Sequence, residues 1–273
     1  MDYSNIDLYQ YINKWVGGTA IYPAYKIDKQ LEAVSKLISS HKSFNNISLI
    51  ATGAKRNGTN ISYMEYLNIY IILDDPSNGT DTRKFKNSIL ELIKKNNNYS
   101  DKIIEITNSL ILDYDNEKIA LFPCFRIIEE NNVEGVLITS VDAVNYMDYP
   151  KLDNKNFDKK EHDCGKNFIN LVKIFKYIFS NFSSEIKSIN ELSPNIVEAL
   201  IWNLPDEYFK FKDYDEGIID AIDYIYEVIA SDDYMSLSEI NDIKVLFSTR
   251  NNLHRKEILK ALYEIKDFIH KNI

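Results

Sequence analysis

Apolar and polar residues in the first half of the chain follow two kinds of spacing. Residues 28–43 carry apolar side chains every three or four positions after Asp28, which predicts a helix that Asp28 caps. A second helical pattern covers residues 81–95. Continuous apolar runs bounded by turn residues predict buried strands, and they lie at 47–54, 66–75, 102–113, 118–128 and 134–140. The first half should therefore fold as helices packed on a mixed sheet.

After Pro150 the spacing changes. Residues 151–163 are charged and predict a connector, and beyond them apolar residues recur only at helical intervals. The predicted helices lie around residues 168–182, 196–202, 218–229 and 253–269. We therefore predict an α+β fold with a sheet-containing lobe at residues 1–150 and a helical lobe at residues 151–273, facing each other across a cleft.

Composition limits the classes of partner. The chain of 273 residues is 45% hydrophobic, which is enough to build a sizeable core, and its net charge of −9 opposes general attraction to nucleic acid or to an anionic membrane. Cys124 and Cys164 lie outside any CxxC spacing, which argues against a zinc site and a disulfide framework. No apolar stretch reaches the ~20 residues of a membrane span, and the N-terminal segment lacks a signal-peptide pattern. We expect a cytoplasmic protein without a membrane partner.

Candidate chemistry is concentrated between the first two predicted strands. The first strand ends in Gly53 and Ala54, a basic turn with a Gly-Thr pair follows, and the second strand begins near Tyr66 and Asn68. Side chains at positions i and i+2 of a strand face the same side, so two carboxylates at such positions can share divalent metal ions. This strand carries a tyrosine and an asparagine there instead.

Several segments resemble one known superfamily. Residues 53–73 resemble the nucleotidyltransferase pattern, in which Gly-Ser and Lys/Arg-Gly-Thr precede Asp-x-Asp, and "KIALFPCFRI" (118–127) is similar to the strand that carries the third acid three residues before a proline. Later segments are similar to the connector, spine helix and helical-lobe motifs of the bacterial cyclic-oligonucleotide synthases: "MDYPKLDNKN", "NFINLVKIFKYI" and "SPNIVEALIWNLPDEYF". These synthases form the CD-NTase group, which is related to oligoadenylate synthase and cyclic GMP-AMP synthase. The resemblance spans roughly residues 28–260 and implies the same fold.

The departures from that pattern fall on the residues of the chemistry. Ala54 stands in place of the serine, Tyr66 and Asn68 in place of the two strand acids, and Ala120 in place of the third acid. Mg²⁺ prefers oxygen ligands and is usually held by anionic carboxylates together with substrate phosphates. Because these degenerate positions bring no charge, we expect no metal ion and no two-metal catalysis.

Three acids near the motif are candidates to replace the missing carboxylates. Glu65 is one residue out of phase with Tyr66 and would point to the opposite face of a strand. Asp113 and Asp115 lie at a predicted hairpin end, where solvated carboxylates are common. Loss of the catalytic site is therefore the preferred interpretation.

The resemblance also implies which residues bind a ligand. Basic residues at the places of Lys173 and Lys176 touch the triphosphate in the CD-NTase group, whereas a pair of solvated lysines is the alternative. Residues after the first strand are predicted to retain anion binding, with a loop that merely connects two strands as the alternative; they are Gly53, Ala54, Lys55 and Thr59.

A basic cluster occurs near the C-terminus. It contains Arg250, His254, Arg255 and Lys256, and it predicts a charged helix start and a small basic patch in an otherwise acidic protein. The spacing from Arg250 to His254 is too short for the Arg-to-His signature of helical ribonucleases. We therefore expect no ribonuclease activity from this cluster.

Three functions remain open at this point. The leading hypothesis is a catalytically inactive nucleotidyltransferase-like protein that binds a nucleotide, a cyclic oligonucleotide or a protein partner, and the resemblance implies a place in antiviral defence signalling. The alternative is an active nucleotidyltransferase that makes a cyclic or linear oligonucleotide with an unconventional metal site, and Mg²⁺ would be a cofactor only in that case. The third is a scaffold with a vestigial cleft. A fold does not establish function, because function depends on the site.

Overall fold

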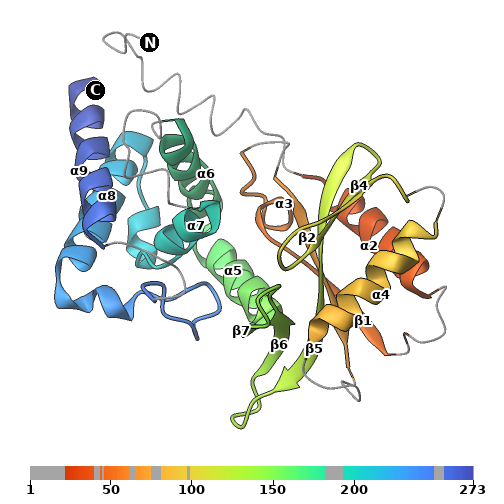
Figure 1. Ribbon diagram of the computed structural model, residues 1–273. Coiled ribbons are helices and arrows are strands. Elements are labelled where there is room, and N and C mark those ends of the chain that lie inside the picture. The colour runs from red at the N-terminus through yellow and green to blue at the C-terminus, as the bar shows by residue number, and fades with distance from the viewer. Residues whose placement is uncertain are drawn as a thin grey trace. The chain divides into compact units, whose positions relative to one another are not determined.

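The computed structural model describes residues 22–39, 44, 46–61, 65–74, 81–96, 99–181, 193–248 and 255–272 (Figure 1). These residues form two compact units, and the division falls between Asn154 and Lys155. The lobes predicted at 1–150 and 151–273 stay predictions in their full extent, since residues 1–21 lie outside the described ranges.

The first unit contains a seven-stranded mixed sheet (Figure 1). Its strands are β1 (Ile47–Thr52), β2 (Leu67–Leu73), β3 (Ile103–Glu105), β4 (Leu110–Tyr114), β5 (Glu117–Ile128), β6 (Glu134–Thr139) and β7 (Asn145–Asp148). The order is β1-β2-β5-β4-β3, with β6 beside β5 and β7 beside β6. Strands β2 and β5 run parallel, and the other pairs are antiparallel. The predicted mixed sheet is therefore confirmed.

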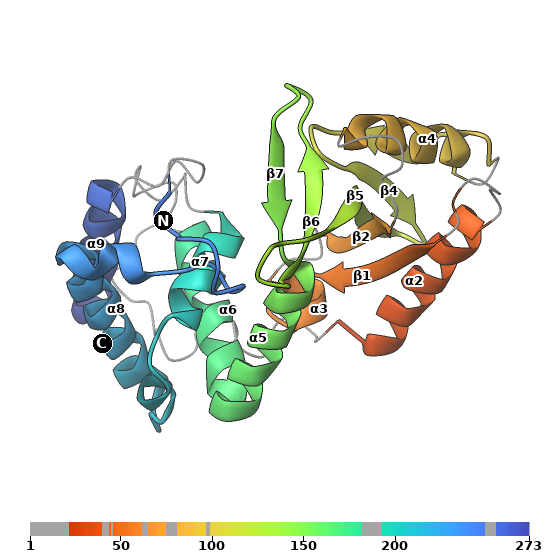
Figure 2. The ribbon, with the colours of Figure 1, turned by 90° about the horizontal axis from the view of Figure 1, so that it is seen from below.

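Two helices pack on one face of this sheet, α2 (Ala24–Ser39) and α4 (Thr82–Lys94) (Figures 1 and 2). Strand residues alternate between the two faces, so Leu67, Ile69 and Ile71 of β2 all point towards these helices and are fully buried. The opposite face carries a smaller apolar cluster around Tyr70 and Ile72. The sheet thus has one covered face, which holds the main core of the unit, and one face with a smaller core.

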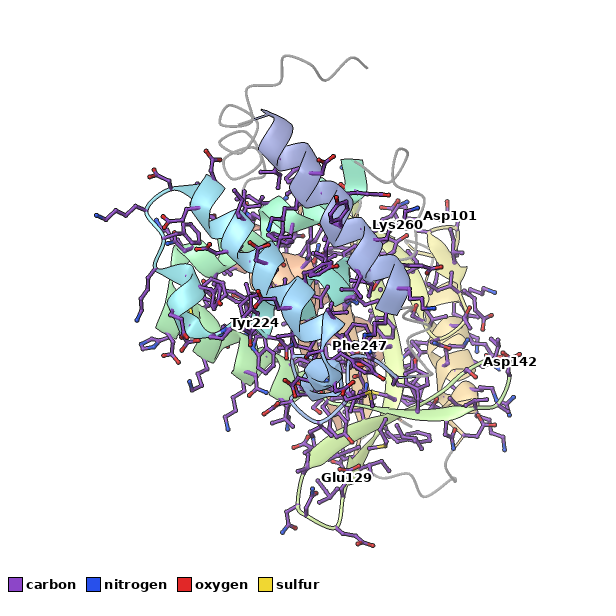
Figure 3. The ribbon with its side chains drawn as sticks, turned by 90° about the vertical axis from the view of Figure 1, so that its left-hand side faces the viewer. Asp101, Glu129, Asp142, Tyr224, Phe247 and Lys260 are labelled. Atoms are coloured by element: carbon purple, nitrogen blue, oxygen red, sulfur yellow. The ribbon has the colours of Figure 1, made fainter. Side chains whose placement is uncertain are left out.

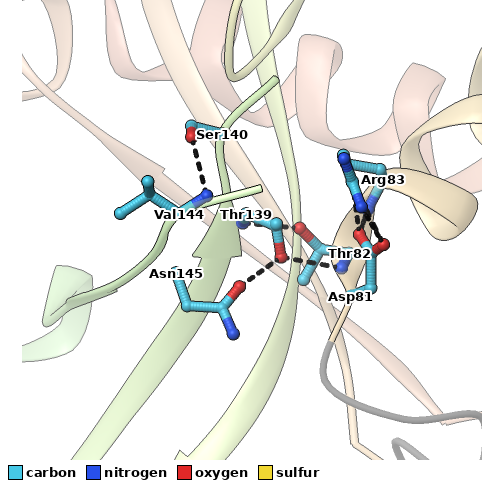
Figure 4. Close-up of polar contacts among 7 residues, drawn as sticks. All are labelled: Asp81, Thr82, Arg83, Thr139, Ser140, Val144 and Asn145. Atoms are coloured by element: carbon cyan, nitrogen blue, oxygen red, sulfur yellow. Dashed lines mark hydrogen bonds and ion pairs between the residues drawn. The ribbon is translucent and has the colours of Figure 1, made fainter. Parts of the chain in front are cut away.

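Hydrogen bonds fix the start of α4 to the end of β6 (Figure 4). The backbone N–H of Thr82 donates to Thr139 Oγ1 at 3.0 Å, and the N–H of Thr139 donates to Thr82 Oγ1 at 2.8 Å. Asp81 caps the helix by accepting from the Arg83 N–H at 2.9 Å. Thr139 Oγ1 also donates to Asn145 Oδ1 at 2.8 Å, which ties β7 to the same point. These bonds explain why the helix begins where the sequence predicted it.

Two local predictions were wrong. Helix α2 begins at Ala24, so Asp28 lies inside the helix and does not cap it. The reason is that Lys26 N donates to Pro23 O at 2.9 Å, so the first turn already starts at the proline. The segment at 151–163 is not a connector but belongs to helix α5 (Pro150–Cys164), in which Phe157 is fully buried and charged side chains pair along the helix. Its few apolar residues hide the helical period in the sequence.

The second unit is helical, as predicted. After α5 its helices are α6 (Lys166–Asn181), α7 (Pro194–Trp202), α8 (Tyr214–Ala230) and α9 (Arg255–Asn272), with short 3₁₀ turns η2 (Asp206–Phe209) and η3 (Asp232–Ser236). Gly165 has φ 67° and separates α5 from α6, a conformation that glycine adopts without steric strain. One apolar core joins these helices. No helix among the described residues is long and apolar enough to span a membrane.

Arg255 caps the end of α8 instead of adding to a basic patch. Its Nε donates to Ile229 O at 2.5 Å and its Nη2 to Ser231 O at 2.7 Å, while the guanidinium lies 4.5 Å from the centre of the Tyr234 ring. A cation at a helix C-terminus also complements the helix dipole. Arg250 and His254 lie outside the described residues, so the predicted patch rests on Lys256 alone among the residues that the structure describes.

Candidate functional site

The turn after β1 has the conformation that its glycines predict. Gly53 has φ 85° and Gly58 has φ 68°, and between them lies the short helix α3 (Ala54–Asn57). A Cβ atom on Gly53 would lie 2.8 Å from Asn68 Nδ2, so a larger residue would clash with the asparagine. The Gly53 turn and the Asn68 side chain are therefore in direct contact.

Strand pairing brings three of the relevant positions into one row. Thr52 of β1 pairs with Asn68 of β2, and Asn68 pairs with Ala120 of β5. Paired residues on neighbouring strands point to the same face of a sheet. We call Thr52, Asn68 and Ala120 the floor row. Tyr66 lies two residues before Asn68, just outside β2, and is 39% exposed. The floor row contains no carboxylate.

Of the three candidate substitute acids, two have other partners and one is exposed. Glu65 Oε2 accepts a hydrogen bond from the Ile61 N–H at 2.7 Å. Asp115 pairs with Lys29 at 2.6 Å. Asp113 is exposed on β4. In the described part of the chain, no group of three or more histidines, cysteines, aspartates or glutamates could hold a metal ion.

One carboxylate on the floor-row face was missed in the sequence. Asp148 of β7 accepts a hydrogen bond from the hydroxyl of Tyr70, the residue that follows Asn68 on this face of β2. Burial raises the pKa of Tyr70 well above its ordinary value, and the negative charge of Asp148 raises it further. Tyr70 therefore stays protonated and donates to Asp148. The "MDYP" segment contains this aspartate, so its resemblance to the family connector was the available signal.

Lys55, a predicted anion-binding residue, is held inside the first unit. It is 1% exposed, and its Nζ lies 2.6 Å from Glu117 Oε2 and 4.8 Å from the centre of the Tyr22 ring. Lys26 contacts the other oxygen of Glu117 at 3.0 Å. Burial alone would raise the pKa of Glu117, but the hydrogen bonds from Lys55 and Lys26 outweigh it and lower that pKa. Glu117 thus fastens α3 to α2, while Thr59, fully buried, follows the same turn.

Lys173 and Lys176 of α6 are both buried, so the alternative of two solvated lysines is wrong. Lys176 Nζ lies 2.8 Å from Glu198 Oε2 on α7, and both side chains are at most 3% exposed. Removing one partner of such a pair leaves a buried charge without compensation. Lys176 therefore has a structural role in the helical unit, and triphosphate contact by either lysine stays a prediction.

Comparisons with known proteins agree with the resemblance found in the sequence. Residues 155–270 match the family model described as the cGAS/DncV-like nucleotidyltransferase C-terminal helical domain. The chain is 24% identical over 304 residues to the cyclic dipyrimidine nucleotide synthase CdnE of Legionella pneumophila, covering 98% of this chain and 100% of that one. Residues 155–270 thus match the C-terminal helical domain of the cGAS/DncV-like nucleotidyltransferases. Over nearly its whole length the chain is similar to a synthase of the CD-NTase group.

Solved structures have the same fold. CdnE of Elizabethkingia meningoseptica, solved with GTP and Apcpp, has a TM-score of 0.77 at 19% identity, covering 96% of this chain and 98% of that one. The c-UMP-AMP synthase CdnE of Rhodothermus marinus, solved with Apcpp and Upnpp, has a TM-score of 0.79 at 14% identity, covering 95% of each chain. CdnC of E. coli, solved in complex with HORMA-deltaN, has a TM-score of 0.71 at 16% identity, covering 96% of this chain and 90% of that one.

These names bear on the two leading functions. They support a nucleotidyltransferase, and they favour the active alternative over the inactive protein, because these relatives are named as synthases. A place in antiviral defence signalling stays a prediction. Some of the relatives were solved with nucleotides or with a protein partner, whereas the floor row is a feature of this chain itself. The two sources of evidence point in different directions on catalysis.

Proposed function

We propose that this chain binds a nucleoside triphosphate or a cyclic oligonucleotide at the Gly53 turn and the floor row, without two-metal nucleotidyl transfer. The single observation that carries the proposal is the floor row itself. The Gly53 turn keeps its left-handed conformation and its contact with Asn68, but Asn68 and Ala120 bring no charge. The part of the site that surrounds a phosphate is retained, and the part that holds metal ions is replaced.

Asn68 is suited to metal-free binding. Its carboxamide can donate a hydrogen bond to a phosphate oxygen. A carboxylate at the same position would repel the phosphate unless a metal ion lay between them, by about 3 kcal/mol at ~5 Å and an effective dielectric constant of about 20. The asparagine therefore removes both the metal site and the repulsion that the metal would have neutralised.

The lysines have different parts in this proposal. Lys55 stays paired with Glu117 and so holds α3 in place. Phosphate binding by Lys173 and Lys176 of the helical unit, which the resemblance implies, is proposed separately. Lys176 would then exchange Glu198 for a phosphate oxygen, which replaces one charge-assisted hydrogen bond by another.

The test is a calorimetric titration of ATP, GTP, CTP and UTP, and of cyclic dinucleotides, in EDTA and in Mg²⁺. We expect the wild-type affinity to be the same in both buffers. Asn68→Asp should weaken binding in EDTA by at least about tenfold, through the repulsion given above, and Mg²⁺ should restore it. Asn132→Asp, which adds the same charge in the exposed turn between β5 and β6, is the matched control and should change neither value. Mg²⁺-dependent binding by the wild type would contradict the proposal.

The second candidate is an active synthase. Its support is the similarity to proteins named as cyclic-nucleotide synthases over nearly the whole chain. Asp148 would be its metal-binding carboxylate, because it lies on the floor-row face through its bond to Tyr70. Incubation with labelled nucleotides and Mg²⁺ or Mn²⁺ tests this candidate by mass spectrometry of the products. Product formation that disappears in Asp148→Asn would replace the first proposal with the second, and absence of product under all these conditions would support the first.

A further inference from the structure

The helical unit contains a pocket between α8 and α9 that neither proposed function uses. Its volume is about 380 Å³, within the range of small-molecule sites. The two helices lie side by side, and Tyr224 on α8 and Lys260 on α9 mark them in Figure 3. Ile222 and Leu262, both fully buried, line the pocket from the two helices. The inner wall is therefore apolar.

Two tyrosines and three charged residues complete the lining. Tyr226 of α8 is 37% exposed and Tyr263 of α9 is 66% exposed, although both rings are large and mostly apolar. Asp223 and Lys266 form an ion pair that joins α8 to α9. With Asp267, the pocket carries two aspartates and one lysine, so its formal charge is −1. An apolar wall, two aromatic rings and a negative charge thus meet in one cavity.

We propose that this pocket binds an alkylguanidinium cation. A guanidinium is weakly hydrated, stacks on aromatic rings and matches the oxygens of a carboxylate, whereas an ammonium is more strongly hydrated. Its methylene stem packs on apolar surface, here Ile222 and Leu262. The tyrosine rings and the negative charge receive the cationic group. The source of the cation is either a free small molecule or an arginine side chain of a partner protein.

The first test measures charge selectivity on the full chain. Arginine amide, agmatine and a short Gly-Arg-Gly peptide are titrated by ¹⁵N NMR. Citrulline amide is the matched probe, because its uncharged ureido group has the shape of the guanidinium group while the rest of the molecule is the same as in arginine amide. We expect shifts of α8 and α9 resonances with the three cations, and at least about fivefold weaker binding of citrulline amide. Equal binding of arginine amide and citrulline amide, or no binding by any cation, would overturn the proposal. Tighter binding of agmatine than of the peptide indicates a free cation, and the reverse order indicates an arginine of a partner.

Two variants then separate recognition from folding. Tyr263→Ala should weaken the binding of arginine amide by about two- to fivefold, which corresponds to the usual energy of an exposed cation–π contact. Tyr25→Ala, which removes a 68% exposed tyrosine from α2 in the other unit, is its control and should change nothing. Lys266→Met removes the positive charge of the pocket and should tighten the binding of arginine amide by about threefold or more. Damage to the helix packing would weaken binding instead, so a looser complex in Lys266→Met, or an unchanged one in Tyr263→Ala, would contradict the proposal.

Discussion

Asn68 and Ile69 are neighbours in β2, yet they belong to the two faces of the sheet and have opposite roles. Ile69 faces the core under α2 and α4 and is fully buried within a large apolar cluster. Asn68 lies on the floor-row face, in contact with Gly53 and paired with Ala120. The covered face determines whether the chain folds, and the floor-row face determines what the folded chain can bind. A substitution on the second face can therefore change the chemistry while the fold persists.

The largest expected effect is on the covered face. Ile69→Ala should lower the free energy of unfolding by about 4 kcal/mol, because it removes a fully buried side chain and leaves a cavity. Urea unfolding followed by circular dichroism measures the change. Ile104→Ala, which truncates an isoleucine that is 66% exposed, is the control and should have a much smaller effect. Equal losses in the two variants would show that burial on this face is not what stabilises the unit.

The ion pairs around Glu117 come next. Glu117→Gln should destabilise the protein by about 2–3 kcal/mol at neutral pH, because Lys55 would be left buried beside a neutral partner. The pKa of Glu117 is lowered in the folded state, so its contribution is fully present above its unfolded value of about 4.3 and is lost as pH falls through the folded pKa. The stability difference between wild type and variant should therefore shrink as pH falls below about 4.

Urea unfolding at several pH values measures this difference. Glu32→Gln is the control, because Glu32 forms an exposed pair with Lys36 within α2, and such pairs stabilise little. A difference for Glu117→Gln that stays constant across the acidic range would mean that the carboxylate charge does not hold Lys55.

A smaller effect is expected on the floor-row face itself. Tyr70→Phe removes the hydrogen bond to Asp148 and should destabilise the protein by about 1.5 kcal/mol. The ring stacking with Phe122, with centroids 5.1 Å apart, is retained in this variant. Thermal unfolding measures the change, and Tyr25→Phe, which alters an exposed tyrosine, is the control. A loss as large as that of Ile69→Ala would remove the distinction between the two faces.

The smallest effect on stability should come from the floor row. Asn68→Asp should change the free energy of unfolding by less than about 1 kcal/mol, because the side chain is only half-buried and keeps its size. Its nucleotide binding should nevertheless become dependent on Mg²⁺, as proposed above. A large loss of stability measured by urea unfolding would show that Asn68 is a core residue, and the comparison between the faces would then fail at this position.

Local patterns in the sequence were sufficient for most of the fold. Continuous apolar runs predicted β1, β2, β5 and β6, and the 3.6-residue period predicted the helices α6 to α9 of the second unit. The single run at 102–113 forms two strands, β3 and β4, and β7 was not predicted. The helix α5 escaped because its residues are mostly charged. Gly53 and Gly58 were recognised as turn residues, and both have positive φ. The absence of acids at positions 66, 68 and 120 was also known from the sequence alone, since the identity of a residue does not depend on the fold.

Other features of the site were decided only by tertiary structure. In the sequence Lys55 looks like a loop lysine and Lys176 like an ordinary helix lysine. Each is buried against a glutamate that is distant along the chain, Glu117 and Glu198 respectively. The register that sets Asn68 beside Ala120 joins strands that are far apart in the sequence. Whether a charged side chain meets solvent, a ligand or an opposite charge depends on which distant residue folding places beside it. Sequence therefore determined which groups this protein has, and the packing of its strands and helices determined which of them are already paired.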